Sequence, residues 1–297
     1  MTATARPAES DATFERHRVR AFSVAYRIVG SVSDAEDVVQ EAWLRWRGID
    51  ANTIRNPEAW LVTATARLAI DALRAARTRR ETYVGSWLPE PLVEAAADTE
   101  PTPEDRLALA DDVSMALLHV LERLAPEERA AFLLHDAFDY DYGELAALLG
   151  KSEAACRQTV SRARRRVHDE HARFDTSARE HARLAAAFST AISNADPQAL
   201  IECFTGDVVF YSDGGGKAIA ALNPIYGADH VMRFFLGILR KRPDGFVPKP
   251  ALVNGLPGFI ALDDTGIHST LGFAVTGGKI SALYMMRNPD KLARIKL

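Results

Sequence analysis

The chain has 297 residues, of which 47% are hydrophobic and 26% charged, and its formal net charge is −4. This balance is typical of a globular protein of two or three domains, and it excludes a disordered or fibrous chain. The two cysteines, Cys156 and Cys203, form neither a disulfide framework nor a CxxC pair for zinc or redox chemistry. Residues 1–11 show no signal peptide, and no apolar run reaches the ~20 residues that span a bilayer, so we expect a cytoplasmic protein.

Charge is distributed unevenly along the chain. Residues 81–150 hold 16 acidic and 3 basic side chains, whereas residues 1–80 hold 10 acidic and 13 basic ones. Residues 151–177 are basic again, with 7 basic against 4 acidic side chains. Because phosphates respond to the local field rather than to the total charge, the negative sum does not exclude nucleic acid as a partner.

Residues 14–80 have apolar side chains at helical spacing throughout. Gly30 ends a first helix, a second begins near Ser33 or Asp34, and Pro57 begins a third, since proline is favoured at the first helical position. We therefore expect an all-helical domain over residues 10–80.

Residues 81–106 are predicted to be a linker, because four prolines stand there among acids and alanines. Its WLPEPL stretch at 87–92 is too apolar for a free tether. We expect Trp87, Leu88 and Leu92 to dock on another part of the protein.

A second helical domain is expected over residues 107–172. One apolar stripe runs from Leu107 to Leu124, and a further helix spans Glu127–Phe138. A capping box over 141–144 begins a short helix that stops at Gly150, and Ser152 caps a last helix through about His168. Two short helices joined by a tight turn fit the helix-turn-helix design, whose second helix enters the DNA major groove.

The last helix of this domain is predicted to present a polar, basic face to DNA. Arginine and glutamine are suited to bidentate reading of base edges, while other basic side chains hold phosphates. The side chains expected on this face or beside it are Lys151, Ser152, Glu153, Arg157, Gln158, Ser161, Arg162, Arg164, Arg165 and Arg166. The alternative is a helical hairpin whose basic face is merely solvated.

A loop that leads into an aromatic-bearing helix suits single-stranded DNA, because unstacked bases rest on rings while arginines follow the backbone. The side chains of this type are Arg55, Asn56, Trp60, Arg67 and Arg74. The alternative is that Trp60 is simply a core residue.

Residues 178–297 change character, with two helices, then alternating β-branched segments and a helix near Asp229–Leu239. Helices packed on one antiparallel, strongly curved sheet would make an α+β domain. The candidates for acid–base chemistry are Tyr211, Asp213, His230, His268 and Tyr284, but no spacing singles out a pair. His168 and His171 lack a third ligand, so we expect no catalytic residue, metal or cofactor.

Several ordered motifs resemble a known family. Residues 14–80, with DAEDVVQE at 34–41 and NPEAWL at 56–61, resemble region two of the sigma-70 family, extracytoplasmic-function type. Residues 107–168, with LAPEER at 124–129 and SRAR at 161–164, resemble region four. The stretches WLPEPL at 87–92, DGGGK at 213–217 and NPDKL at 288–292 are similar to the subgroup with a fused SnoaL-like domain, the sigma-J type.

The resemblance implies an RNA polymerase sigma factor that directs transcription initiation. It implies contact with the β′ clamp helices of the core polymerase through Asp37, Gln40 and Glu41, and with the β flap. It assigns the −10 promoter element to Arg55, Asn56, Trp60, Arg67 and Arg74. It assigns the −35 element to Lys151, Ser152, Arg157, Gln158, Ser161, Arg162 and Arg165. Two positions depart from the family pattern, since Arg67 stands where asparagine is usual and Thr159 where arginine is usual.

The fused SnoaL-like domain, residues 178–297, is expected to regulate the sigma domains in cis without doing chemistry. The expected contact joins Trp87, Leu88, Pro89 and Glu90 of the linker, and the sigma domains, to Asp213, Gly214, Gly215, Gly216 and Lys217. Such a glycine-rich stretch is also what a simple turn between strands would need.

Two further readings stay open. The chain could be a cyclase or isomerase type of enzyme tethered to DNA-binding helices, since SnoaL-like folds host enzymes and non-enzymes alike. It could also be a one-component repressor whose C-terminal domain senses a ligand.

Overall fold

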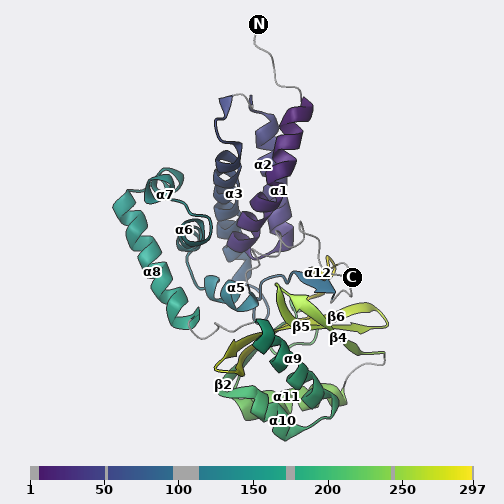
Figure 1. Ribbon diagram of the computed structural model, residues 1–297. Helices are drawn as coiled ribbons and strands as arrows, with labels where there is room; N and C mark the ends of the chain where they lie inside the picture. The colour runs from purple at the N-terminus through teal and green to yellow at the C-terminus, as the bar shows by residue number, and fades with distance from the viewer. Residues whose placement is uncertain (1–6, 51–52, 96–113, 172–177, 242–244, 296–297) are drawn as a thin grey trace. The chain divides into compact units, whose positions relative to one another are not determined.

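The computed structural model describes residues 7–50, 53–95, 114–171, 178–241 and 245–295. The chain forms two compact units (Figure 1). The first unit comprises Met1–Glu81 with Leu121–Arg166, and the second comprises Thr82–Val120 with Val167–Leu297. The linker after residue 81 and the helix before residue 121 thus fold with the C-terminal part of the chain.

The first unit begins with the helices α1 (Pro7–Val29), α2 (Val32–Arg47) and α3 (Pro57–Arg80). Gly30 ends α1 in the left-handed conformation, with φ 72°, which glycine adopts without strain. Ser31 then caps α2 by accepting the Asp34 N–H at 3.2 Å. The three helices expected from the apolar spacing are confirmed, and α2 begins two residues before Asp34.

The helix-turn-helix lies in the same unit and consists of α7 (Tyr142–Leu149) and α8 (Glu153–His171), preceded by α6 (Pro126–Ala137). Asp141 and Glu144 form the expected capping box, with reciprocal bonds of 2.8 and 2.9 Å. Gly150 ends α7 with φ 65°. The helix α5 (Met115–Leu121) ends before Leu124, and the expected first turns of that helix, within residues 96–113, lie outside the described residues.

The second unit is built on a seven-stranded sheet of order β1-β4-β5-β6-β7-β2-β3. The strands are β1 (Val93–Ala95), β2 (Phe204–Asp213), β3 (Ile225–Tyr226), β4 (Val247–Val253), β5 (Leu256–Asp263), β6 (Gly266–Thr276) and β7 (Lys279–Met286). All neighbours are antiparallel except β2 and β7, which run parallel. The expectation of a wholly antiparallel sheet is wrong at this pair, because a parallel neighbour needs a long crossover that no local pattern reveals.

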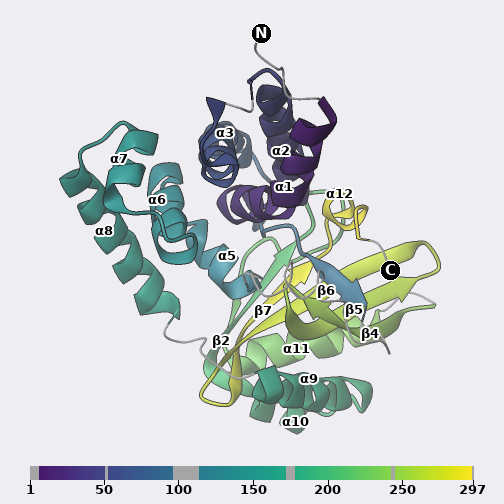
Figure 2. The same ribbon diagram turned by 45° about the horizontal axis from the view of Figure 1, so that its top comes forward.

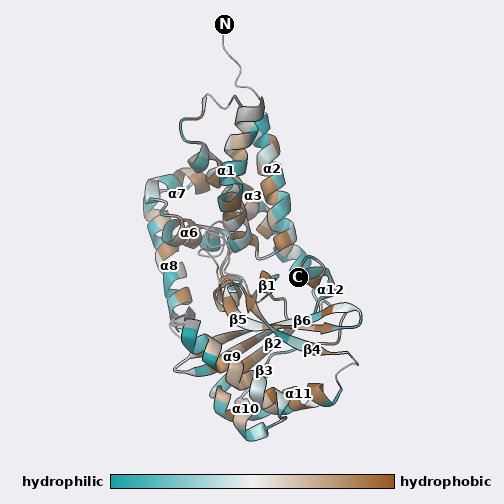
Figure 3. Cartoon of the chain, turned by 45° about the vertical axis from the view of Figure 1, so that its right-hand side comes forward, coloured by the Kyte–Doolittle hydropathy of each residue, from teal (hydrophilic) through white to brown (hydrophobic). Residues whose placement is uncertain are grey.

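The two faces of the sheet have different covers. The helices α9 (Ala178–Ser193), α10 (Pro197–Cys203) and α11 (Ala228–Arg240) gather on one side of it (Figure 2). Phe188, Phe210 and Phe273 pack together there. Brown and teal residues alternate around α9 and α11 in Figure 3, as expected of helices with one buried face.

The other face of the sheet is covered by the linker. Tyr284 and Met286 of β7 pack against Leu88, Met115 of α5 and Leu292 of α12 (Pro289–Leu292). Because neighbouring side chains of a strand point to opposite faces, Tyr284 and Leu283 serve different cores. The α+β fold class expected from the sequence is confirmed, with the linker as an added layer.

His181 of α9 is a buried titratable group in this unit, with 3% of its surface exposed. Burial lowers the pKa of its imidazole to about 4, against a small opposing effect of its hydrogen bond to the Pro257 backbone. The folded unit therefore holds His181 neutral at pH values where the unfolded chain protonates it.

We expect the second unit to lose stability as the pH falls from about 6.5, the usual histidine pKa, to about 4. In that window the unfolded chain binds the extra proton, so the full loss is about 3 kcal/mol. Denaturant unfolding at pH 7 and pH 4 measures it. His181→Asn should remove most of this dependence, and His230→Asn, at an exposed position of α11, should keep it; an unchanged dependence in His181→Asn would contradict the assignment.

Candidate promoter-binding and linker-contact sites

The helix α8 carries most of the residues assigned to the −35 element on one exposed face. Arg157, Gln158, Ser161, Arg162 and Arg165 are exposed. The other face of the helix is buried in the domain, through Cys156, Val160 and Ala163. This alternation of faces leaves the basic side of α8 available to a ligand, as a recognition helix requires.

Two positions at this helix have local structural roles. Ser152 caps α8, because its Oγ accepts the Ala155 N–H at 3.2 Å. Thr159 is 4% exposed, and its Oγ1 donates to the Ala155 carbonyl at 2.9 Å. The departure from the family pattern at Thr159 therefore lies on the inner side of α8 and does not change the exposed face.

Several basic side chains of this domain are paired with nearby acids. Arg157 lies 3.4 Å from Glu153 and stacks over the Tyr142 ring at 5.3 Å. Arg164 makes a bidentate contact with Asp136, at 2.7 and 2.8 Å, and this hydrogen bonding raises the pKa of its guanidinium. Such exposed pairs are weak, so DNA phosphates can replace the carboxylates.

The residues assigned to the −10 element lie before α3 and along its exposed side. Arg55 and Asn56 are exposed, and Asn56 also caps α3 by accepting the Ala59 N–H at 3.1 Å. Trp60 is half-buried, with its ring 5.5 Å from that of Trp46. The indole thus packs on the core and still has a solvent-facing part. This arrangement is compatible with a core role for Trp60 and with a ring on which an unstacked base rests.

The residues assigned to the core polymerase form a ridge on α2. Asp37, Gln40 and Glu41 are exposed and stand three and four residues apart, which places them on one helix face. Leu44, 52% exposed, continues this face by one turn, and Glu41 pairs with Arg45 at 3.0 Å. A polar ridge that ends in an exposed leucine is suited to docking on another protein.

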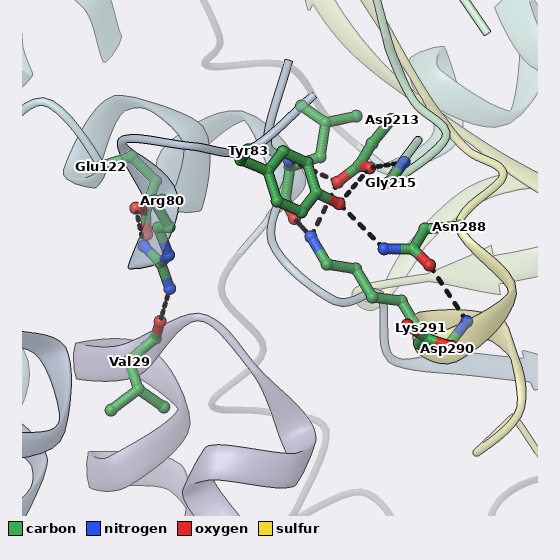
Figure 4. Close-up of polar contacts among 10 residues, drawn as sticks. Val29, Arg80, Tyr83, Glu122, Asp213, Gly215, Asn288, Asp290 and Lys291 are labelled. Atoms are coloured by element: carbon green, nitrogen blue, oxygen red, sulfur yellow. Dashed lines mark hydrogen bonds and ion pairs between the residues drawn. The ribbon is translucent and has the colours of Figure 1, made fainter. Parts of the chain in front are cut away.

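Within the first unit, two arginines, one from α3 and one from α6, bind carbonyls at the end of α1. Arg129 of α6 is fully buried and donates to the Arg27 carbonyl at 2.9 Å. Arg80 of α3 donates to the Val29 carbonyl at 2.9 Å, so both satisfy the free carbonyls at the end of α1. The Glu122 carboxylate accepts from both arginines, and Figure 4 shows its contact with Arg80.

Sequence reasoning missed this cluster. Arg129 ends the LAPEER motif, which was used to find region four and not to predict a buried charge. A single sequence offers no signal for it, since an arginine on a helix is normally exposed.

In the second unit, Asp213 holds the linker against the end of β2. The carboxylate is fully buried and accepts the Leu88 N–H at 2.9 Å, the Tyr83 hydroxyl at 2.6 Å and the Gly215 N–H at 3.0 Å. The Lys291 ammonium completes its surroundings at 2.7 Å (Figure 4). The structure thus brings the WLPEPL, DGGGK and NPDKL stretches into one site.

Lys291 and Tyr83 extend this site beyond the residues that the sequence singled out. Lys291 lies 4.1 Å from the Trp87 ring centroid and donates to the Leu88 carbonyl. Burial, with the hydrogen bond to Asp213, raises the pKa of the Tyr83 phenol far above its ordinary value. Its hydroxyl also accepts from Asn288 at 2.8 Å.

The glycines of the DGGGK stretch are required by close approach. A side chain on Gly214 would lie 2.3 Å from the Ala218 carbonyl oxygen, and one on Gly215 would lie 2.3 Å from the Asn288 amide. A side chain on Gly216 would press on Val84 of the linker at 3.2 Å. Lys217 at the end of the stretch is exposed and pairs with Asp290 at 2.6 Å.

The rest of the linker motif is buried and continues into the sheet. Pro89 and Glu90 are buried, and β1 then pairs with β4 through Val93 and Val253. The linker therefore adds an edge strand as well as a docking segment.

The acid–base candidates of the C-terminal part do not converge. Tyr211 and Tyr284 stack at 5.6 Å, with His119 of α5 4.4 Å from the Tyr211 ring. His268 instead pairs with Asp263 at 2.8 Å, and His230 is exposed on α11. Across the described ranges, no three potential metal-ligating side chains gather at one point, and no helix has the length and apolar character to cross a membrane.

A helix-turn-helix with an exposed basic face, joined in one unit to a three-helix module, defines a promoter-binding protein of the sigma-70 class. The sigma-70 region 2 model matches residues 13–79, and the sigma-70 region 4 model matches residues 114–167. The ECF RNA polymerase sigma factor SigJ of Mycobacterium tuberculosis is 41% identical over 288 residues, which cover 94% of this chain and 91% of that protein.

Two further comparisons agree. The probable ECF RNA polymerase sigma factor SigI of the same organism is 31% identical, covering 95% of this chain and 94% of that protein. The crystal structure of M. tuberculosis SigJ matches with a TM-score of 0.79 and 38% identity, over 96% of this chain and 99% of that chain. The chain belongs to the family of extracytoplasmic-function RNA polymerase sigma factors.

Replacing Asp213 should destabilise the second unit. We expect Asp213→Ala to lower its free energy of unfolding by about 3–5 kcal/mol, because Lys291 and the Leu88 N–H are left buried without their partner. Denaturant unfolding measures the loss. Asp290→Ala removes an exposed pair and should cost less than about 0.5 kcal/mol; equal losses would refute the role of Asp213.

Proposed function

We propose that the two helical modules of this sigma factor divide promoter recognition between them. The −35 element is bound by the exposed face of α8, through Arg157, Gln158 and the residues beside them. The −10 element is bound by Arg55, Asn56 and Trp60, with Arg67 and Arg74 along α3. The observation that supports this most directly is the exposed polar face of α8, since its apolar side is entirely used for packing.

The core polymerase is proposed to bind on two surfaces. The ridge of Asp37, Gln40 and Glu41 contacts the β′ clamp helices, and region four contacts the β flap. The exposure of all three ridge side chains on one face of α2 supports the first contact.

The C-terminal domain is proposed to act in cis on the sigma modules. Its support is the site around Asp213, where the linker that connects the two sigma regions makes three polar contacts: the Tyr83 hydroxyl and the Leu88 N–H donate to the Asp213 carboxylate, and Lys291 donates to the Leu88 carbonyl. A conformational change that moves Asp213 or Lys291 would therefore also move the linker segment that is bonded to them. We propose no catalytic role for the domain, because Asp213 is fully engaged and Tyr211 packs against His119.

The functional boundaries proposed are 10–80 for region two, 81–106 for the linker, 107–172 for region four and 178–297 for the SnoaL-like domain. These differ from the compact units, since residues 82–95 and most of α5 pack with the C-terminal part.

Transcription with core polymerase on a randomised promoter pool tests the proposal. The full chain should enrich transcripts that share two upstream elements, and Gln40→Ala with Glu41→Ala should reduce the yield without changing those elements. Asp213→Asn, which keeps the side-chain shape, should change the rate of initiation if the domain acts in cis. No enrichment would contradict promoter direction, and an unchanged rate in folded Asp213→Asn would contradict regulation.

Arg157→Ala should relax the −35 sequence preference by about 1–3 kcal/mol, because a bidentate contact with a base edge is lost. The measurement is competition binding between the selected −35 sequence and single-base variants of it. Arg165→Ala is the matched control, since Arg165 is predicted to hold phosphate and should weaken all sequences alike. A uniform loss in Arg157→Ala would make Arg157 a phosphate contact instead.

A further inference from the structure

We propose that Glu127 is an internal lock that holds the two DNA-binding modules against each other in the free chain. Its carboxylate engages Arg74, assigned to the −10 element, and Lys151, assigned to the −35 element. DNA must displace it from both. The proposal rests on the promoter assignments above.

The geometry at Glu127 gives each carboxylate oxygen a cation. Arg74 donates to Oε1 at 2.6 Å, and the Lys151 ammonium donates to Oε2. Glu127 is the second residue of α6, where the helix dipole favours a negative charge. The hydrogen bond from Lys151, together with that from Arg74, lowers the pKa of the carboxyl group, so it stays ionised near neutral pH.

A second −10 arginine is engaged in the same way. Arg67 donates to the Ala147 carbonyl at 3.2 Å. That carbonyl lies in the last turn of α7, where helix carbonyls lack an internal partner and carry partial negative charge. Both α3 arginines assigned to the −10 element therefore bind region four, Arg74 at α6 and Arg67 at α7. In the promoter complex, DNA phosphates would take the place of these acceptors.

The two modules also make contacts that do not involve Glu127. Thr63 of α3 and Tyr140 share a hydrogen bond of 3.1 Å, and the buried Arg129 reaches the end of α1. These contacts are buried or partly buried, whereas Glu127 is one-third exposed and open to competition by anions. Glu127 therefore lies at the exposed edge of the interface between the modules, where DNA phosphates would first compete for Arg74 and Lys151.

In the conformation in which the two modules are in contact, the chain cannot bind both promoter elements at once. The elements named −10 and −35 stand roughly 25 base pairs apart, which is roughly 80 Å of duplex at 3.4 Å per base pair. The helix α3 has 24 residues and is thus only about 36 Å long. Binding both elements requires the Arg74–Glu127 contact to break, and the affinity of the free chain is reduced by the fraction that is closed.

The test compares Glu127→Gln with Asp136→Asn in the full chain. Both remove one negative charge from α6, but Asp136 pairs with Arg164 inside the helix-turn-helix module. The probes are a duplex with the −35 element and a single strand with the −10 element, both taken from the promoter pool. Glu127→Gln should bind the duplex roughly two- to tenfold more tightly than Asp136→Asn, as expected for two exposed ion pairs.

The lock also predicts coupling between the two probes. In the native chain, the −10 strand should raise the affinity for the −35 duplex, because each probe favours the open state. Asp136→Asn should keep this coupling, and Glu127→Gln should lose most of it. Equal duplex affinities and equal coupling in the two variants would overturn the proposal.

A measurement without DNA separates the lock from the promoter assignments. Thr63→Cys places a thiol beside Tyr140, and its labelling rate by a thiol reagent reports the open fraction. The native Cys156 and Cys203 are buried, and the chain without Thr63→Cys supplies their background. Adding Glu127→Gln should raise the rate roughly 1.5- to fivefold, because the single exposed pair between Arg74 and Glu127 crosses the modules there, while Asp136→Asn should not. Faster labelling without any DNA binding would keep the lock and refute the promoter assignments; unchanged labelling would overturn the lock.

Discussion

The need to partner every buried charge organises both units. In the first unit, Arg129 is fully buried and pairs with Glu122, which also accepts from Arg80, so removing Glu122 would leave two arginines without their carboxylate. Arg129 also donates to the Arg27 carbonyl at the end of α1, which ties region four to region two. The opening on a promoter that we propose would separate these regions, and the interface combines buried contacts with an exposed edge at Glu127 that anions can reach.

The second unit depends on Asp213 in the same sense. Its carboxylate draws donors from the linker, from its own loop and from the segment after β7. The three short motifs that mark the subgroup in sequence are thus the parts of a single buried polar site. Their spacing in the chain reflects where β2 and β7 end, because those strands lie side by side in the sheet.

Local features were predictable where a local cause exists. Gly30, Asp141 and Gly150 mark helix ends through backbone conformation or capping, and the strands follow from alternation. The parallel pair β2 and β7, the edge strand β1 and the burial of Arg129 depend on residues far apart in sequence, so no single-sequence pattern reports them. The same holds for the site at Asp213, where the carboxylate was foreseen as a contact point but Tyr83 as its partner was not.

The edge strand β1 affects the order in which the chain can fold during its synthesis. Leu88, the strand β1 and Met115 lie in sequence between the two stretches of the first unit, but they pack with strands that are all synthesised more than a hundred residues after β1. Until β4 emerges, that linker has no pairing partner and leaves its apolar side chains in water. The helical modules can therefore fold first, while the linker waits for the last third of the protein to arrive.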